Sequence, residues 1–189
     1  TEQFRSVNSL PRDISLFTVG EDIYASATPS EEVSSLRTST AEIETFLVDN
    51  AASKDVAVGG YDAYEVSFTL KPQSEGKTKV TLCNACGEKF SLEFDTENMT
   101  VLADRSESGK MTRIKSFVLM PAAPLGLCTS SDGYDVDVFV DKCSVEVFVD
   151  GGRIAMTNLV FPSESFDNIV FESTGESEIS NMFIHKIGK

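Results

Sequence analysis

The sequence predicts an all-β protein, built as a concanavalin- or lectin-like sandwich of two antiparallel sheets. Two observations lead to this fold class. Apolar and polar residues alternate over many short runs, which is the pattern of strands with one buried face. Turn-forming residues separate these runs at regular intervals, so that at least about nine short strands are expected. A chain of 189 residues is long enough to enclose a core between two such sheets.

The predicted elements follow the chain in order. Pro29 and Ser30 favour the start of one helical turn over residues 30–36. Two strands flank the polar turn Asn84-Ala85-Cys86-Gly87 and are expected to form a hairpin. Polar connections are expected at residues 34–40 and 50–54. Alternation predicts further strands at residues 42–48, 62–70, 79–82, 89–95, 100–104, 113–119, 168–173 and 178–187.

The strongest strand signal lies at residues 136–158. Valines at positions 136, 138 and 140 share one face of a strand, and valines at 145, 147 and 149 share one face of the next. The segment Asp150-Gly151-Gly152-Arg153 supplies a hairpin turn, with either Asp-Gly or Gly-Gly at its centre. Both registers keep Ile154, Met156 and Asn158 on the valine face. In both, Glu146 and Phe148 point to the opposite face.

This stretch resembles the signature of the C-terminal β-sandwich of family 32 glycoside hydrolases, which include invertases, inulinases and levanases. The resemblance rests on Val-Asp-Lys-Cys-Ser-Val-Glu-Val-Phe-Val-Asp-Gly-Gly-Arg at residues 140–153. Cys143 departs from the family, which usually carries a small hydroxyl residue there. The residues that carry the signature are Asp141, Val145, Glu146, Phe148, Gly152, Thr157 and Pro162.

The resemblance extends over nearly the whole chain. It implies three parts: a closing segment of a propeller at residues 1–28, a linker at 29–40 and the sandwich at 41–189. The matching segments are Phe4-Arg5-Ser6, Leu10 to Leu16, Glu31 to Arg37, Tyr64-Glu65-Val66, Leu92 to Asp95 and Asp104-Arg105-Ser106.

Catalysis in this family, as the resemblance implies, belongs to a five-bladed propeller that precedes the sandwich. Its carboxylates lie in Asn-Asp-Pro, Arg-Asp-Pro and Glu-Cys motifs, and none of these motifs occurs in this sequence. Retaining glycosidases need two carboxylates about 5–5.5 Å apart. We therefore predict no catalytic residue, no cofactor and no metal in this chain, although the parent protein would be a retaining hydrolase of fructans or sucrose. Glu146 is expected to be structural, on an outer or interdomain face.

The charge balance limits the classes of molecule that the protein is expected to bind. Sixteen basic residues against 30 acidic ones give a net charge of −14, which opposes binding to nucleic acid and to anionic membranes. A neutral polysaccharide is compatible with this charge. No run of about 18 apolar residues occurs, so we expect neither an anchor nor an export signal within the sequence. The family resemblance implies a parent that is secreted, periplasmic or at the cell surface.

Cysteine and histidine give weak signals. Cys83 and Cys86 have the spacing of a redox or zinc pair, but they lie in a predicted hairpin rather than at a helix start. Zinc would need further ligands, such as Cys128 and Cys143. Free thiols or a local disulfide are expected instead. His185 is the only histidine, and a packing or surface role is expected because no nucleophile elbow accompanies it.

The sequence raises three alternatives: a calcium site and two other kinds of sandwich. The aspartates at 132, 135, 137 and 141 could invite calcium, but they lack the spacing of a calcium loop and are expected to form a solvated strand edge. A free-standing carbohydrate-binding sandwich is the alternative to the enzyme module, and a purely structural or adhesive sandwich is the third possibility. Sugar binding would need an aromatic platform, whose tyrosine candidates are Tyr24, Tyr61, Tyr64 and Tyr134.

Overall fold

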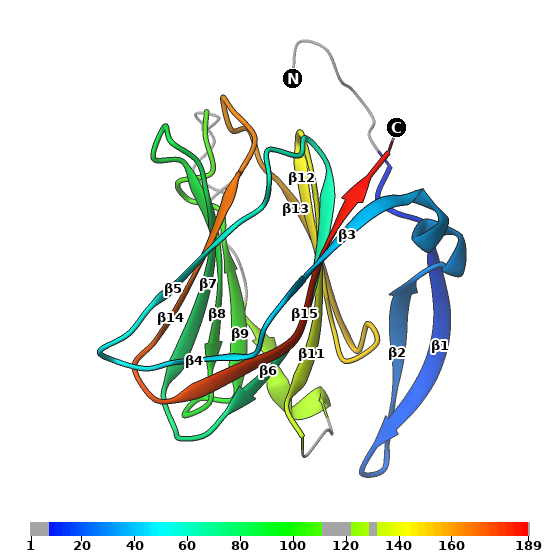
Figure 1. Cartoon of the computed structure of the whole chain (residues 1–189). Coiled ribbons are helices and arrows are strands. Elements are labelled where there is room, and N and C mark those ends of the chain that lie inside the picture. Colours follow the sequence, from blue (N-terminus) through cyan, green and yellow to red (C-terminus); the bar gives the residue numbers. More distant parts are fainter. Residues whose placement is uncertain (1–7, 111–121, 129–131, 189) are drawn as a thin grey trace.

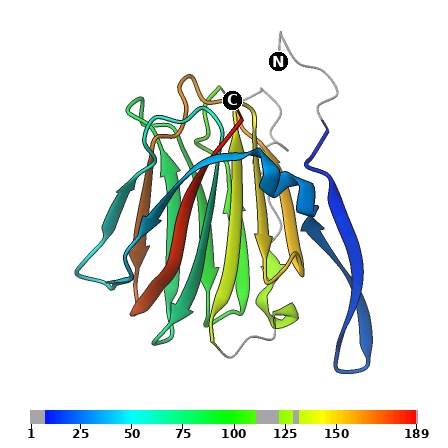
Figure 2. The ribbon, with the colours of Figure 1, turned by 45° about the vertical axis from the view of Figure 1, so that its right-hand side comes forward.

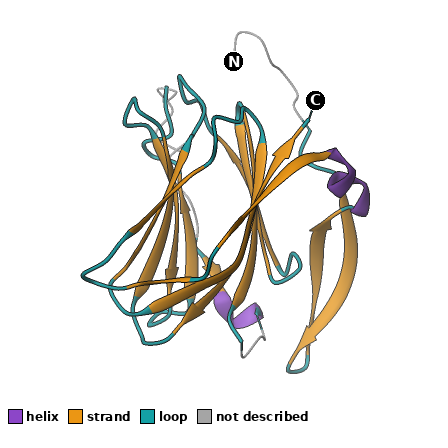
Figure 3. Ribbon diagram, viewed as in Figure 1, coloured by secondary structure: helices purple, strands orange, loops and turns teal. Residues whose placement is uncertain are grey.

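The computed structural model describes residues 8–110, 122–128 and 132–188, which form two packed sheets and a separate hairpin. Figure 1 shows the three as layers, with the hairpin beside one sheet and the second sheet on the far side. Strands dominate, as Figure 3 shows, so the predicted all-β sandwich is confirmed. The strand predicted at 113–119 and the segment Phe4-Arg5-Ser6 lie outside the described residues. Within the described ranges, no helix is long and apolar enough to cross a membrane.

The larger sheet has seven strands, all paired antiparallel. Its order is β13-β12-β11-β6-β15-β3, and β4 also pairs with β15. The strands are β3 (Arg37–Ile43), β4 (Phe46–Val48), β6 (Tyr64–Pro72), β11 (Tyr134–Asp141), β12 (Ser144–Val149), β13 (Ile154–Leu159) and β15 (Ser177–Ile187).

The smaller sheet has six strands in the order β10-β9-β8-β7-β14-β5. A short 3₁₀ turn, η3 (Leu125–Leu127), follows β10. The strands are β5 (Lys54–Ala57), β7 (Lys77–Cys83), β8 (Lys89–Asp95), β9 (Thr100–Asp104), β10 (Ala123–Pro124) and β14 (Asn168–Ser173).

The valine face predicted from the sequence lies in the core between the two sheets. All six valines of β11 and β12 are at most 5% exposed. Val147 pairs with Met156 and Val149 with Ile154, which is the register with Gly151 and Gly152 at the centre of the turn. Both glycines have positive φ, the conformation that this tight turn requires.

The N-terminal hairpin consists of β1 (Arg12–Val19) and β2 (Asp22–Pro29) and forms a sheet of its own. A 3₁₀ segment, η1 (Glu31–Leu36), leads from it into β3 at the place predicted for a helical turn. Figure 2 shows from a second side that the hairpin stands outside the sandwich, and β2 contacts β13. The hairpin therefore covers part of the outer face of the seven-stranded sheet.

Three local predictions need correction. The single strand expected at 42–48 is two strands, β3 and β4, which pair with β15 in one common register and are interrupted at Glu44 and Thr45, opposite the place where β15 shifts its register against β6. Strand β3 begins within residues 34–40, and strand β5 begins at the last residue of 50–54. Both segments were expected to be polar connections. The aspartates of β11 do not line a strand edge, because β11 pairs with β12 on one side and β6 on the other.

Candidate functional site: the contact between hairpin and sandwich

The outer face of the seven-stranded sheet carries a row of buried side chains beside the hairpin. Glu146, Phe139, Glu65 and His185 are neighbours in register on four successive strands. They are only 4%, 7%, 1% and 9% exposed. Buried carboxylates on an outer face need partners, because an unpaired charge away from water is costly. Segments from the N-terminal part of the chain supply these partners.

Glu146 is the anchor for the hairpin. Its carboxylate accepts hydrogen bonds from the Leu10 backbone N–H at 2.8 Å and from the Arg12 guanidinium at 2.5 Å. The hydroxyl of Thr157 on the neighbouring strand donates to the same carboxylate at 3.3 Å. The Arg12 guanidinium also lies over the ring of Phe148, 5.0 Å from its centroid, a cation–π arrangement. Arg12 also donates a hydrogen bond to the Thr157 hydroxyl, so one arginine of β1 is fixed by three residues of the sandwich.

Gly152 brings the backbone of the hairpin against the sandwich. Its carbonyl accepts a hydrogen bond of 2.9 Å from the N–H of Ala27 on β2. A Cβ atom at Gly152 would lie 2.2 Å from the Ala27 carbonyl oxygen, so only glycine permits this approach. We call Glu146, Phe148, Gly152 and Thr157 the hairpin seat.

A small apolar cluster separate from the main core fills the space beneath the hairpin and η1. Val33 of η1 packs with Phe139 and Phe148, and Leu10 and Ile187 join at the margin. The two phenylalanine rings meet edge to face, with centroids 5.9 Å apart. The segments on either side of the hairpin are therefore attached by an apolar contact, in addition to the ion pair between Arg12 and Glu146.

A second arginine holds the start of β3. Arg37 donates two hydrogen bonds to Glu65, at 2.7 and 2.6 Å, and these bonds raise the pKa of Arg37. Asp137 lies nearby in a cleft of about 280 Å³ beneath η1, and its carboxylate accepts no hydrogen bond from any described residue. Burial, assisted by the charge of Glu65, raises the pKa of Asp137 to about 6. Burial lowers the pKa of His185, whose Nδ1 lies 2.8 Å from the Thr40 hydroxyl.

The hairpin also has a face that the sandwich does not cover. Ile14, Leu16 and Ile23 are 66%, 75% and 68% exposed, and the register of β1 and β2 places them on the same face. Among the described strands, β1 and β2 pair only with each other. An isolated two-stranded hairpin is marginally stable in water. An exposed apolar face on such a hairpin is typical of a surface that contacts another domain or protein.

The structure brings together four of the seven signature residues predicted from the sequence, and these four form the hairpin seat. Val145 lies instead in the main core, fully buried. Asp141 and Pro162 line a separate groove at the end of β11. The sequence placed Glu146 on the outer face correctly, but it did not reveal that Arg12 or Arg37 would neutralise the buried glutamates.

The cysteines, acidic residues and tyrosines that the sequence suggested for redox, metal or sugar sites do not form such sites in the described residues. The four cysteines all lie in the described part of the chain and are free thiols, and burial raises the pKa of Cys128 to about 12. Within the described residues, no group of three or more His, Cys, Asp or Glu is placed to hold a metal ion. Tyr64 is fully buried and Tyr134 stacks on Phe94, so the four tyrosines do not form one platform.

Comparison with known proteins agrees with this architecture. Levanase from Bacillus subtilis (strain 168) is 26% identical over 193 residues, which cover 100% of this chain and 28% of the levanase. Extracellular exo-inulinase from Aspergillus awamori is 26% identical over 179 residues, which cover 93% of this chain and 33% of the enzyme. The chain thus spans no more than about a third of the length of these two curated relatives.

Solved structures share the fold. A crystal structure of exo-inulinase from Aspergillus awamori superposes with a TM-score of 0.78 at 23% identity, over 96% of this chain and 36% of the other. A β-fructofuranosidase structure from Schwanniomyces occidentalis gives a TM-score of 0.76 at 18% identity, over 96% and 40%. The family model for "Glycosyl hydrolases family 32 C terminal" matches residues 32–186. This match covers most of the chain, which therefore belongs to the C-terminal domain family of the family 32 glycosyl hydrolases.

Proposed function

We propose that this chain is the noncatalytic C-terminal module of an enzyme that cleaves β-fructofuranosidic bonds in fructans or sucrose. Its role is to cover and stabilise a catalytic five-bladed propeller in the same polypeptide. The relatives that match along nearly the whole chain are longer enzymes, levanases and exo-inulinases, of which this chain corresponds to a minor part. An intrachain partner follows naturally from that difference in length.

The observation that carries the proposal is the two-sided hairpin. One side is bound to the sandwich: Ser26 of β2 is buried, and the Arg153 guanidinium lies over the ring of Phe17 on β1, while Glu146 holds Arg12 at the start of β1. The other side exposes Ile14, Leu16 and Ile23. In the proposed parent, residues 1–28 close the propeller and residues 29–40 link it to the sandwich of residues 41–189, with strand β3 of the sandwich beginning inside the linker at Arg37. The hairpin would then fix the position of the sandwich relative to the catalytic domain.

The location of the parent protein is part of the same proposal. Relatives that match this chain include exo-inulinases named extracellular. We propose a secreted, periplasmic or surface-attached parent, where polymeric fructan would be accessible.

The coding sequence upstream of Thr1 tests the proposed function. The proposal expects an in-frame domain with Asn-Asp-Pro, Arg-Asp-Pro and Glu-Cys motifs. A start codon or a bare export signal directly before Thr1 would overturn it and would favour the free-standing sandwich.

A further inference from the structure

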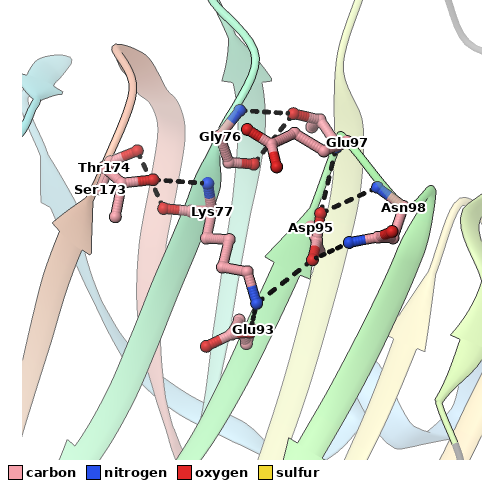
Figure 4. Close-up of polar contacts among 9 residues, drawn as sticks. Gly76, Lys77, Glu93, Asp95, Glu97, Asn98, Ser173 and Thr174 are labelled. Carbon is pink, nitrogen blue, oxygen red and sulfur yellow. Dashed lines mark hydrogen bonds and ion pairs between the residues drawn. The ribbon is translucent and has the colours of Figure 1, made fainter.

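One acidic side chain beside the hairpin lacks the partners that the buried carboxylates of this protein have. Glu65 and Glu146 are each held by an arginine from the N-terminal part of the chain. Asp95, on the six-stranded sheet, pairs with the Lys77 ammonium and accepts hydrogen bonds from two backbone N–H groups of the next turn, as Figure 4 shows. Asp137 accepts no hydrogen bond from any described residue. Its carboxylate therefore has unused capacity for a donor.

Asp137 lines the cleft of about 280 Å³ beneath η1. The rest of the lining comes from the end of β2, from η1 and from side chains of β6 and β11. Two hydroxyls of the lining donate elsewhere, since Thr28 bonds to a carbonyl of β1 and Ser34 to a carbonyl within η1. The volume lies just below the range of small-molecule sites, about 300–1,000 Å³. It is enough for the end of one long side chain.

The lining of this cleft is acidic. Three carboxylates (Glu31, Glu65 and Asp137) and one cation (Arg37) leave a formal charge of −2. The Arg37 guanidinium gives two hydrogen bonds to Glu65, at 2.7 and 2.6 Å. Asp135, two residues before Asp137 on the same strand, adds a further negative charge nearby. The cleft therefore attracts a cation.

The chemistry of the lining selects the kind of cation. A metal ion fits poorly, since among the described residues no three His, Cys, Asp or Glu side chains are placed to hold one. An ammonium or guanidinium group needs only one carboxylate and forms a charge-assisted hydrogen bond with it. The ring of Phe139 also lines the cleft, and aromatic rings favour cations. The cleft thus fits the side chain of a lysine or an arginine.

The cleft borders the surface that the proposed function assigns to the catalytic domain. Its lining includes Thr28 and Pro29, the last two residues of β2. Ile14, on the exposed apolar face of the hairpin, pairs in register with Ala27, the residue before Thr28. The two surfaces are therefore continuous, and a domain that covers the hairpin lies close to the cleft.

We propose that the cleft receives a lysine or arginine side chain of the catalytic domain and that this side chain pairs with Asp137. The identity of the domain rests on the proposed function, whereas the basic chemistry rests on the cleft itself. Glu146 and Glu65 already hold arginines of the hairpin and the linker, and Asp137 would hold the catalytic domain against both. A neutral or acidic partner surface is disfavoured, because it would bury the Asp137 charge unpaired.

Proton binding by Asp137 reports the arrival of the basic group. In the 189-residue chain, burial and the charge of Glu65 raise the pKa of Asp137 to about 6, with Arg37 opposing the rise and Asp135 adding to it. A cation at hydrogen-bond distance would bring this pKa below about 4. The docked state then binds fewer protons, so docking should weaken as the pH falls from about 6 to about 4.

The first test is a ¹³C titration of the aspartate carboxyl groups in the 189-residue chain and in the protein extended by its upstream coding residues. Asp137→Asn identifies the Asp137 signal by its absence. The expected midpoint is near pH 6 in the 189-residue chain and about two pH units lower in the extended protein. Equal midpoints would overturn the proposal. A midpoint that depends on the concentration of the 189-residue chain would also overturn it, by placing a second copy of the chain in the cleft.

The second test uses Asp137→Asn at pH 7, where the effect should change sign between the two proteins. In the 189-residue chain the amide removes an unpaired charge, so the midpoint of thermal unfolding should rise by about 5 °C. In the extended protein the same substitution removes an ion pair, and unfolding of the sandwich should shift down by a similar amount. Glu172→Gln, exposed on β14, is the control and should leave both midpoints unchanged. A rise in both proteins, or no change in the extended one, would contradict the pairing.

These outcomes separate the basic side chain from the proposed function. If the hairpin amides become protected in the extended protein but the titration of Asp137 does not move, the basic side chain is wrong and the proposed function stands. If the upstream coding sequence lacks the catalytic motifs, the proposed function is overturned and the source of the side chain is overturned with it.

Discussion

The Arg12 guanidinium and the Glu146 carboxylate lie 2.5 Å apart, although 134 positions separate them in the chain. Arg12 belongs to the hairpin and Glu146 to the second of the two valine-rich strands. Glu146 is only 4% exposed, so the pair is shielded from water. Removing one partner of such a pair leaves the other charge uncompensated. This contact is therefore a main attachment of the hairpin to the sandwich, beside the hydrogen bond between Ala27 and Gly152.

Glu146→Gln should release the hairpin. The amide retains an oxygen for the Leu10 N–H, but it no longer neutralises Arg12. We expect a loss of about 2–3 kcal/mol in the free energy of unfolding, measured by urea denaturation. Glu44→Gln is the matched control, because Glu44 is exposed in the break between β3 and β4. Equal stability of the two variants would contradict the anchoring role of Glu146.

Gly152→Ala should be more damaging than Gly151→Ala. Both glycines have positive φ, which costs about 1–2 kcal/mol for alanine. At Gly152 the new Cβ would also lie 2.2 Å from the Ala27 carbonyl oxygen, whereas at Gly151 the nearest atom is 3.9 Å away. We expect a total loss of about 3 kcal/mol or more for Gly152→Ala. Hydrogen exchange of the Ala27 amide should accelerate only in that variant, and similar behaviour of both would refute the close contact.

Asp137 should make stability fall as the pH rises from about 4 to about 6. Burial raises the pKa of this carboxyl to about 6, whereas the unfolded chain ionises it near pH 4. The protonated form is favoured by the folded state, so its stabilisation is complete below pH 4 and is lost as the pH passes the folded pKa. A shift of about two pH units corresponds to about 3 kcal/mol.

The variant Asp137→Asn isolates this effect. It should be more stable than the wild type at pH 7, and the stability difference between the two proteins should shrink as the pH falls to 4. Thermal unfolding at closely spaced pH values measures that difference. A difference independent of pH would show that Asp137 titrates normally.

Leu16→Asp distinguishes the isolated chain from the proposed parent. Leu16 is 75% exposed, so in the isolated chain the substitution should change the free energy of unfolding by less than about 0.5 kcal/mol. In the protein that includes the upstream domain, it should cost about 1–3 kcal/mol because it would bury a charge. Leu47→Asp is the control, since Leu47 is 56% exposed on β4 and should be tolerated in both contexts.

The sequence predicted those parts of the fold in which one side chain in two is buried. Alternating valines placed β11 and β12 and fixed the outward direction of Glu146 and Phe148. The larger part of strand β3 was missed because six of its seven residues are exposed, which leaves no alternation to detect. The break at Glu44 lies opposite the register shift between β15 and β6, more than a hundred residues away in the chain, which the local sequence does not reveal.

The contacts of the candidate site were less predictable than its position. The pattern of β12 showed that Glu146 leaves the core, but it could not show which group neutralises it. Arg12 and Arg37 reach Glu146 and Glu65 only because the hairpin and η1 fold back over the sheet. Such pairing depends on tertiary structure, so the local sequence around either arginine does not predict it.

Hydrogen exchange of the hairpin amides tests the central claim most directly. It should be measured in the 189-residue chain and in the protein extended by its upstream coding residues. The account predicts that amides of β1 and β2 around Ile14, Leu16 and Ile23 exchange rapidly in the isolated chain and become strongly protected in the extended protein, while the core amides of β11 and β12 change little. Equal exchange of the hairpin amides in both proteins would contradict the claim that this hairpin docks the module onto a catalytic domain.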